Sequence, residues 1–283
     1  MPGNETMAQK IAANINAELA EFTLRRFPDG ETYLRITSDL LGKNCVFVCS
    51  LNQPDDKILA LYYLSKLCRE LGADKVTLIS PYLSYMRQDT RFHEGEAITS
   101  EYFAQLLSKW FDELITVDPH LHRKHNMSEL YSIPCKVLHS PPVIADWIKN
   151  NIKNPLLIGP DSESEQWVSD TARYIDAPYI ILEKNRLGDK SVEISVPNVS
   201  KFVGRTPVLV DDIISTARTM IETVYHLIKA QMQPPVIIGV HAVFSGDAFQ
   251  NLKDSGVSEI ITCNTIPHIT NRIDFSKEIS KNL

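Results

Sequence analysis

The segment VLVDDIISTARTM, residues 208–220, places two carboxylates and three hydroxyls just after a short apolar run. These residues are Asp211, Asp212, Ser215, Thr216 and Thr219. In an open parallel sheet, ligands bind beyond the carboxyl ends of the strands, where helix N-termini present unpaired N–H groups. Hydroxyls and N–H groups there suit a phosphate, and paired carboxylates suit sugar hydroxyls or a Mg²⁺ ion that carries phosphate oxygens. The alternative is structural: one aspartate caps the strand, and Ser215 caps a helix that begins near Thr216.

The elements that must position these residues alternate between strands and helices. Short apolar runs such as VFVCSL (46–51) and PVLVDD (207–212) are separated by segments with helical periodicity. This alternation predicts βαβ units and mainly parallel sheets, and the continuous apolar strands predict helices on both sheet faces. A looser, proline-containing stretch lies near 134–142. We therefore predict an α/β protein with two domains, residues 1–140 and 141–267, and a tail (about 268–283) that packs back on the first domain.

Length and composition narrow the class of protein. A chain of 283 residues is long enough for two domains, and a net charge of -6 argues against nucleic acid or an anionic membrane as a partner. MPGNETMAQK lacks the apolar core of a signal peptide, and no apolar run approaches the ~18 residues of a membrane span. The five cysteines form no CxxC pair, which is typical of reduced thiols in a cytoplasmic protein.

The segment 208–220 looks like the phosphoribosyl-binding loop of the phosphoribosyltransferase fold. Other segments resemble one family of that fold, ribose-phosphate diphosphokinase (PRPP synthetase), in the family's order and over nearly the whole chain. They are RRFPDGETYLRI (25–36), PYLSYMRQDTRFHEGEAITSEYFAQLL (81–107), TVDPH (116–120), IILEKNR (180–186) and NTIPHITNRIDFSKEISKNL (264–283). The spellings RFHEGEAIT and LEKNR are most similar to the short, archaeal-type branch.

The resemblance implies two tandem phosphoribosyltransferase-type domains, with ATP on the first and ribose 5-phosphate on the second. It implies Mg²⁺-dependent transfer of the diphosphoryl group of ATP to the C1 hydroxyl of ribose 5-phosphate, which gives PRPP and AMP. Attack at phosphorus requires positioning and cations more than covalent chemistry. Lys184 and Arg186, in EKNRLGDK, match the family's mobile catalytic loop. Without the resemblance, they would be ordinary surface cations of a hairpin.

The resemblance also implies the binding residues. The ribose 5-phosphate set is Asp211, Asp212, Ser215, Thr216, Ala217, Arg218 and Thr219. The metal set is His120 and Asp161, although a lone histidine after a strand is more often a packed core residue. His122 and His125 have poor zinc spacing and are interpreted as surface residues.

For ATP, the resemblance implies Phe27 as an aromatic face for adenine and Asp29 and Glu31 as acceptors. It adds Arg87 and Gln88 for the triphosphate and adenine. In related enzymes the FPDGE loop completes the nucleotide site of a neighbouring subunit, so the protein is expected to be a homo-oligomer, dimeric or higher. The alternatives are a PDG turn and an exposed arginine on a loop.

Three positions depart from the family. Ser162 to Glu165 read SESE where the common bacterial and animal branch has a glycine pair. Arg218 stands where the family usually has glycine, and the chain begins where the family's first strand should end. Two rival hypotheses remain. The SESE segment and Arg218 favour a catalytically impaired partner that assembles with an active relative, and the 208–220 loop is shared with phosphoribosyltransferases that consume PRPP. A phosphoribosyltransferase would not be expected to carry YMRQD, EKNR and FPDGE together.

Overall fold

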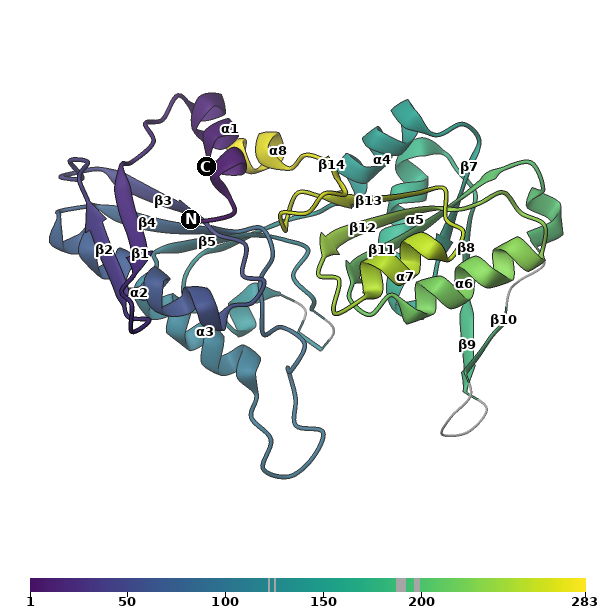
Figure 1. Ribbon diagram of the computed structural model, residues 1–283, viewed down its shortest axis with the longest axis horizontal. Helices are drawn as coiled ribbons and strands as arrows, with labels where there is room; N and C mark the ends of the chain where they lie inside the picture. Colours follow the sequence, from purple (N-terminus) through teal and green to yellow (C-terminus); the bar gives the residue numbers. More distant parts are fainter. Residues whose placement is uncertain (122, 125, 187–191, 196–198) are drawn as a thin grey trace. The chain divides into compact units, whose positions relative to one another are not determined.

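The computed structural model describes residues 1–121, 123–124, 126–186, 192–195 and 199–283 (Figure 1), without the side chains of residues 163, 183–186, 192–195 and 200. The chain divides into two compact units. The first unit contains Met1–Leu138 and Ser276–Leu283, and the second contains His139–Phe275. Among the described residues, no helix has the length and apolar character that a bilayer crossing requires. None of the five cysteines forms a disulfide.

The first unit is built on a four-stranded parallel sheet in the order β3-β4-β5-β6, with a separate antiparallel hairpin, β1-β2. Its elements are α1 (Glu5–Ile15), β1 (Phe22–Arg26), β2 (Thr32–Ile36), β3 (Asn44–Val48), α2 (Asp55–Glu70), β4 (Lys75–Ser80), α3 (Thr99–Trp110), β5 (Glu113–Val117), the 3₁₀ turn η1 (Met127–Glu129), β6 (Cys135–Leu138) and α8 (Ser276–Ser280). Every residue of β5 is buried, as expected of a central strand in a parallel sheet that is covered on both faces.

The second unit is built on a six-stranded parallel sheet in the order β14-β13-β12-β11-β7-β8, with an antiparallel hairpin, β9-β10. Its elements are α4 (Pro141–Asn151), β7 (Pro155–Gly159), η2 (Ser162–Ser164), α5 (Glu165–Ile175), β8 (Tyr179–Ile181), β9 (Glu183–Arg186), β10 (Val192–Ser195), η3 (Val199–Phe202), β11 (Thr206–Ile214), α6 (Arg218–Lys229), β12 (Val236–Ala242), α7 (Ala248–Asp254), β13 (Glu259–Cys263) and β14 (Asn271–Ile273). The α/β class with mainly parallel sheets flanked by helices is therefore confirmed.

Two sequence expectations about element boundaries are corrected. The stretch near 134–142 is not loose, because it contains β6 and the first turn of α4, where Pro141 occupies a position that suits proline. The helix after the hydroxyl-rich segment begins at Arg218 instead of near Thr216. The helix starts later than predicted because Ala217, with a φ of 59°, is in the left-handed conformation and cannot be part of a right-handed helix.

The C-terminal tail joins the first unit later than expected. Residues 271–273 form β14 in the second sheet, and only the part from Ser276 onward belongs to the first unit. There Asn14 Nδ2 donates to Ser280 Oγ at 3.1 Å, and Lys136 Nζ donates to the carbonyl of Asn282 at 2.7 Å. Among the tail's apolar residues, Ile273, Phe275 and Ile279 are buried, whereas Ile269 is 73% exposed.

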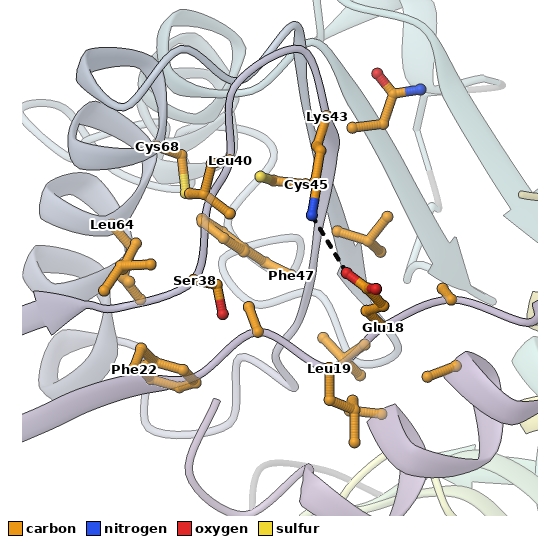
Figure 2. A pocket seen from close by; sticks show the side chains of 18 of the residues that line it. Glu18, Leu19, Phe22, Ser38, Leu40, Lys43, Cys45, Phe47, Leu64 and Cys68 are labelled. Carbon is orange, nitrogen blue, oxygen red and sulfur yellow. Dashed lines mark hydrogen bonds and ion pairs between the residues drawn. The ribbon is translucent and has the colours of Figure 1, made fainter.

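An apolar cavity lies along β3, the outermost strand of the first sheet (Figure 2). Leu64 and Cys68 of α2 line it together with Leu19 and Phe22, and a Lys43–Glu18 ion pair of 3.2 Å joins two residues of its lining. Because the N–H of Cys49 bonds to β4, alternation along the strand directs the backbone groups of residues 46 and 48 away from β4. The Val48 carbonyl accepts the terminal ammonium of Met1 at 3.1 Å, and in the described part of the chain no strand pairs with Val46 on this side, which lies beside the apolar surface.

Candidate active site

Three carboxylates meet at the carboxyl ends of β7 and β11. These strands are neighbours in register, with Leu209 beside Ile158, so Asp161, just after β7, comes beside the acidic pair of β11. The pair lies inside β11, since the strand continues to Ile214 beyond the predicted end. Asp212 is 7% exposed, and its N–H donates to Asp211 Oδ1 at 3.0 Å. The sheet thus brings together residues that lie some fifty positions apart in sequence.

The electrostatics of this cluster disfavour three full negative charges. Burial, followed by the charges of Asp212 and Asp161, raises the pKa of the Asp211 carboxyl well above its ordinary value of 3.8. Loss of water disfavours the charged form, and like charges nearby add to that effect. A ligand that supplies hydroxyl donors or positive charge would relieve the repulsion, which is the behaviour expected of a sugar site or a metal site.

The hydroxyl-rich segment after β11 forms a short loop that leads into α6. Ala217, in its left-handed conformation, is 7% exposed, and its carbonyl accepts the N–H of Ile221 at 2.9 Å, which starts the helix. The amides of the first turn have no acceptor within the helix, and the helix dipole adds positive potential there. Arg218 is exposed at the first helical position. The loop therefore presents hydroxyls and N–H groups together, as a phosphate requires.

The SESE segment is a capping turn in the structure. The Asp161 side chain accepts the N–H of Ser164 at 3.3 Å, and Ser164 Oγ donates to the Asp161 carbonyl at 2.6 Å. Gly159 makes room for this turn, because a Cβ there would lie 2.5 Å from Ser164 Oγ. Glu165 is exposed in the first turn of α5, where an acid is favourable. The side chain of Glu163 lies outside the description.

In the first unit, Arg87, Gln88 and His120 follow neighbouring strands. Arg87 and Gln88 come after β4, and His120 comes after β5, so all three lie at the carboxyl ends of the first sheet. Arg87 is exposed. Gln88 is tied into the start of α3, because its Oε1 accepts the hydroxyl of Thr99 at 3.0 Å. A structural role for Gln88 is thus as well supported as the expected nucleotide contact.

The expected adenine residues lie on the β1-β2 turn. Phe27 is 40% exposed, and its N–H donates to the carbonyl of Glu31 at 2.8 Å. Asp29 and Glu31 are exposed on the same turn. The guanidinium of Arg25 lies 4.8 Å from the centre of the Phe27 ring, a distance at which a cation–π interaction stabilises the position of the ring. This contact was not predicted from the sequence; the position of Arg25, two residues before Phe27, was the available signal.

The remaining predicted residues are less fully described. Lys184 and Arg186 lie on the backbone of β9, and their side chains are outside the description. His122 and His125 lie outside the described residues altogether. His120 belongs to the first unit and Asp161 to the second.

The described residues suit magnesium better than a metal that requires a full protein cage. In the described part of the chain, no group of three or more histidine, cysteine or acidic residues could hold a metal ion. Magnesium usually takes one or two carboxylates, several waters and substrate phosphates. The carboxylate of Asp161 is a hard oxygen donor and fits one such position.

Comparisons with known proteins define the class first. A family model described as a phosphoribosyl transferase domain matches residues 128–278, and one described as the N-terminal domain of ribose phosphate pyrophosphokinase matches residues 1–110. In overall fold, the chain is similar to the crystal structure of phosphoribosylpyrophosphate synthetase from Mycobacterium smegmatis, with a TM-score of 0.84 and 21% identity, over 98% of this chain and 93% of that one. The protein has the phosphoribosyltransferase fold.

Sequence relatives then define the family. The ribose-phosphate pyrophosphokinase of Sulfolobus acidocaldarius is 31% identical over 97% of this chain and 96% of its own. That of Methanopyrus kandleri is also 31% identical, over 97% of this chain and 94% of its own. The chain belongs to the ribose-phosphate pyrophosphokinase family, as its motifs predicted.

Proposed function

We propose that this protein is a Mg²⁺-dependent ribose-phosphate diphosphokinase, which transfers the diphosphoryl group of ATP to the C1 hydroxyl of ribose 5-phosphate and releases AMP. One observation carries the proposal. In a chain of the ribose-phosphate pyrophosphokinase family, a carboxylate cluster adjoins a hydroxyl-rich helix N-terminus at the end of β11. The first feature suits a sugar, and the second suits a phosphate.

In this proposal, the loop from Ser215 to Thr219 holds the 5-phosphate. Hydroxyls and the free amides of the first turn of α6 donate to the phosphate oxygens. The carboxylates of Asp211 and Asp212 accept the ribose hydroxyls, which fixes the sugar with C1 available. The sugar-binding carboxylates and the phosphate-binding loop both lie within residues 211–219. The end of β11 therefore fixes the distance between them.

The transfer itself needs the attacking C1 oxygen and the leaving α,β-bridging oxygen in line at the β-phosphorus. The C1 oxygen of ribose attacks the β-phosphorus of ATP, the bond from that phosphorus to the α,β-bridging oxygen breaks, and the C1 hydroxyl proton leaves to solvent or a carboxylate. Lys184 and Arg186 stabilise the charge that grows on the transferred group and on the departing AMP. Phe27, Asp29, Glu31, Arg87 and Gln88 orient the nucleotide.

Asp161 and His120 are each proposed as a ligand of Mg²⁺ that is carried by substrate oxygens. When bound, the ion neutralises phosphate charge. The enzyme works as a homo-oligomer in which the Phe27 turn completes the ATP site of a neighbour. It works in the cytoplasm, which suits five cysteines that form no disulfide.

The test follows both products. Purified protein is incubated with ATP, Mg²⁺ and ribose 5-phosphate, and AMP and PRPP are measured together by mass spectrometry. We expect equal amounts of both, and neither when unphosphorylated ribose replaces the sugar phosphate. ADP with inorganic phosphate would indicate a different ATP-consuming activity and would contradict the proposal.

Two other outcomes would favour the rivals. Folded protein that yields neither product, with inorganic phosphate supplied, would indicate the impaired assembly partner, and co-purification with an active relative would then be sought. Consumption of added PRPP in the presence of a purine base, without any use of ATP, would indicate a phosphoribosyltransferase.

A further inference from the structure

The segment after β12 is bonded directly to the phosphate loop. The N–H of Phe244 donates to the Ile214 carbonyl at 2.8 Å, and the N–H of Ser245 donates to the Ser215 carbonyl at 3.0 Å. The hydroxyls of Ser215 and Ser245 lie 3.1 Å apart, within hydrogen-bond distance. Because β11 and β12 are parallel neighbours, with Ile214 beside Ala242, the segments that follow them leave the same edge of the sheet. Ser245 thus contacts Ser215 through both backbone and side chain.

The position of Ser245 is itself fixed by its surroundings. The preceding Phe244 has a φ of 38°, an unusual conformation for an aromatic residue. Its ring packs at 5.4 Å from Phe249 and at 4.7 Å from His268, which holds that conformation in place. On the other side, the Ser245 carbonyl accepts the N–H of Ala248 at the start of α7. Such over-determined backbone is typical of positions that serve a function.

The hydroxyl pair has a preferred direction when an anion binds. A phosphate oxygen accepts hydrogen bonds and donates none in its ionised form, so a serine hydroxyl that faces it must donate. Ser215 can do so while its own oxygen accepts the proton of Ser245. The resulting chain, from Ser245 to Ser215 to phosphate, polarises the inner hydroxyl and strengthens its bond.

We propose that Ser245 is a positioning residue for the ribose 5-phosphate site, which acts by holding and orienting Ser215. This inference rests on the proposed function, since it assumes that the loop binds the 5-phosphate. It predicts that the Ser245 hydroxyl raises affinity for the sugar phosphate and leaves ATP binding unchanged.

The experiment is a double-mutant cycle on ligand affinity. The Kd for ribose 5-phosphate is measured by calorimetry for the wild type, Ser245→Ala, Ser215→Ala and the double variant, with the KM of each substrate and kcat alongside. We expect Ser245→Ala to weaken ribose 5-phosphate binding about five-fold, with the KM for ATP unchanged. In the Ser215→Ala background, the same change should have no further effect.

Two further variants separate positioning from folding. Ser245→Thr keeps a hydroxyl and should restore most of the affinity, even if Ser245→Ala lowers the melting temperature. Ser169→Ala is a matched control on α5, where the hydroxyl donates to the Gln166 carbonyl of its own helix, and it should leave affinity unchanged.

The outcomes distinguish the two levels of the proposal. Unchanged affinity in Ser245→Ala, or losses that simply add in the double variant, would overturn the role of Ser245 while the wild type still binds and converts ribose 5-phosphate. A wild type that neither binds nor converts ribose 5-phosphate would overturn the proposed function, and the inference with it.

Discussion

Lys184 is the residue on which the proposed reaction is expected to depend most. Its ammonium group is proposed to meet charge that exists only as the diphosphoryl group transfers, so its loss should affect turnover more than binding. We expect Lys184→Ala to lower kcat by about 10²–10³-fold with little change in melting temperature. The measurement is the initial rate of AMP release at saturating substrates. Lys201→Ala, at an exposed lysine of η3, is the control, and a near-wild-type rate in Lys184→Ala would remove the assignment.

Arg218 tests whether a departure from the family adds a contact or crowds the site. The side chain is exposed, so it is not packed into the loop, and it begins α6, whose N-terminus is proposed to bind the phosphate. We expect Arg218→Gly to weaken ribose 5-phosphate binding about five- to ten-fold, because a charged hydrogen bond is lost. Isothermal titration calorimetry at two salt concentrations measures the Kd for ribose 5-phosphate. Tighter binding in the variant would show crowding, and Arg173→Gly at the exposed end of α5 serves as control.

Residues within one motif could be predicted from the sequence, and residues that meet across the fold could not. Asp211 and Asp212 lie in the same thirteen-residue segment as the hydroxyls of Ser215, Thr216 and Thr219, so the sequence alone groups them. Ser245 lies thirty positions from Ser215, and its contact depends on which strands are neighbours. The hydrogen bond between Gln88 and Thr99 was also not predictable, because it depends on α3 beginning at Thr99.

Strand β5 owes part of its stability to a buried acid that joins three strands. Glu113, with 9% of its side chain exposed, lies 2.6 Å from Lys75 Nζ on β4 and 3.0 Å from Lys136 Nζ on β6. We expect Glu113→Gln to lower the free energy of unfolding by about 1–2 kcal/mol, less than a fully buried pair because both lysines are 43% exposed. Urea unfolding measures this, with Glu278→Gln in the exposed pair with Lys281 as control.

The effect of Glu113 should depend on pH in a definite direction. Burial opposes the charged form, but the hydrogen bonds from Lys75 and Lys136 outweigh burial and lower the pKa of the Glu113 carboxyl below its ordinary value of 4.5. A lowered pKa in the folded state contributes stability that is present above pH 4.5 and is lost as the pH falls through the folded value. The difference between wild type and Glu113→Gln should therefore be full at pH 7 and should shrink below pH 4.5. A difference that stays constant down to pH 3 would contradict this.

Central strands were predictable because their sequence favours burial on both faces, as the largely apolar run at 236–242 does. The short strands β6 and β14 were not. Each has only three or four residues and exists because a neighbouring strand offers hydrogen bonds, β5 for one and β13 for the other. The left-handed conformation of Ala217 was also not predictable, since glycine, not alanine, is the residue that usually indicates it.

The proposed assembly can be tested by mixing two inactive variants. If the Phe27 turn of one subunit completes the site that contains Lys184 of another, co-expressed Lys184→Ala and Phe27→Ala chains should regain activity. In a randomly mixed dimer, half of the molecules are hybrids with one intact site, so we expect about a quarter of the wild-type rate. Steady-state AMP release by the co-purified mixture measures it.

The control for this experiment is a mixture of the two variants purified separately and kept from exchanging subunits, which should show only the sum of their residual rates. Activity in the co-expressed sample no greater than that sum would mean that Phe27 and Lys184 serve the same subunit. A monomeric mass by light scattering would contradict the assembly itself.

The outer edge of β3 has a consequence for handling the protein. Among the described strands, β3 has a neighbour on one side only, and Val46 is 37% exposed beside the apolar cavity. Open edges of this kind are where separate chains join into aggregates. Loss during storage or warming should then be second order in protein concentration, so dilution should slow it. A lysine at position 46 should slow that loss while leaving turnover unchanged.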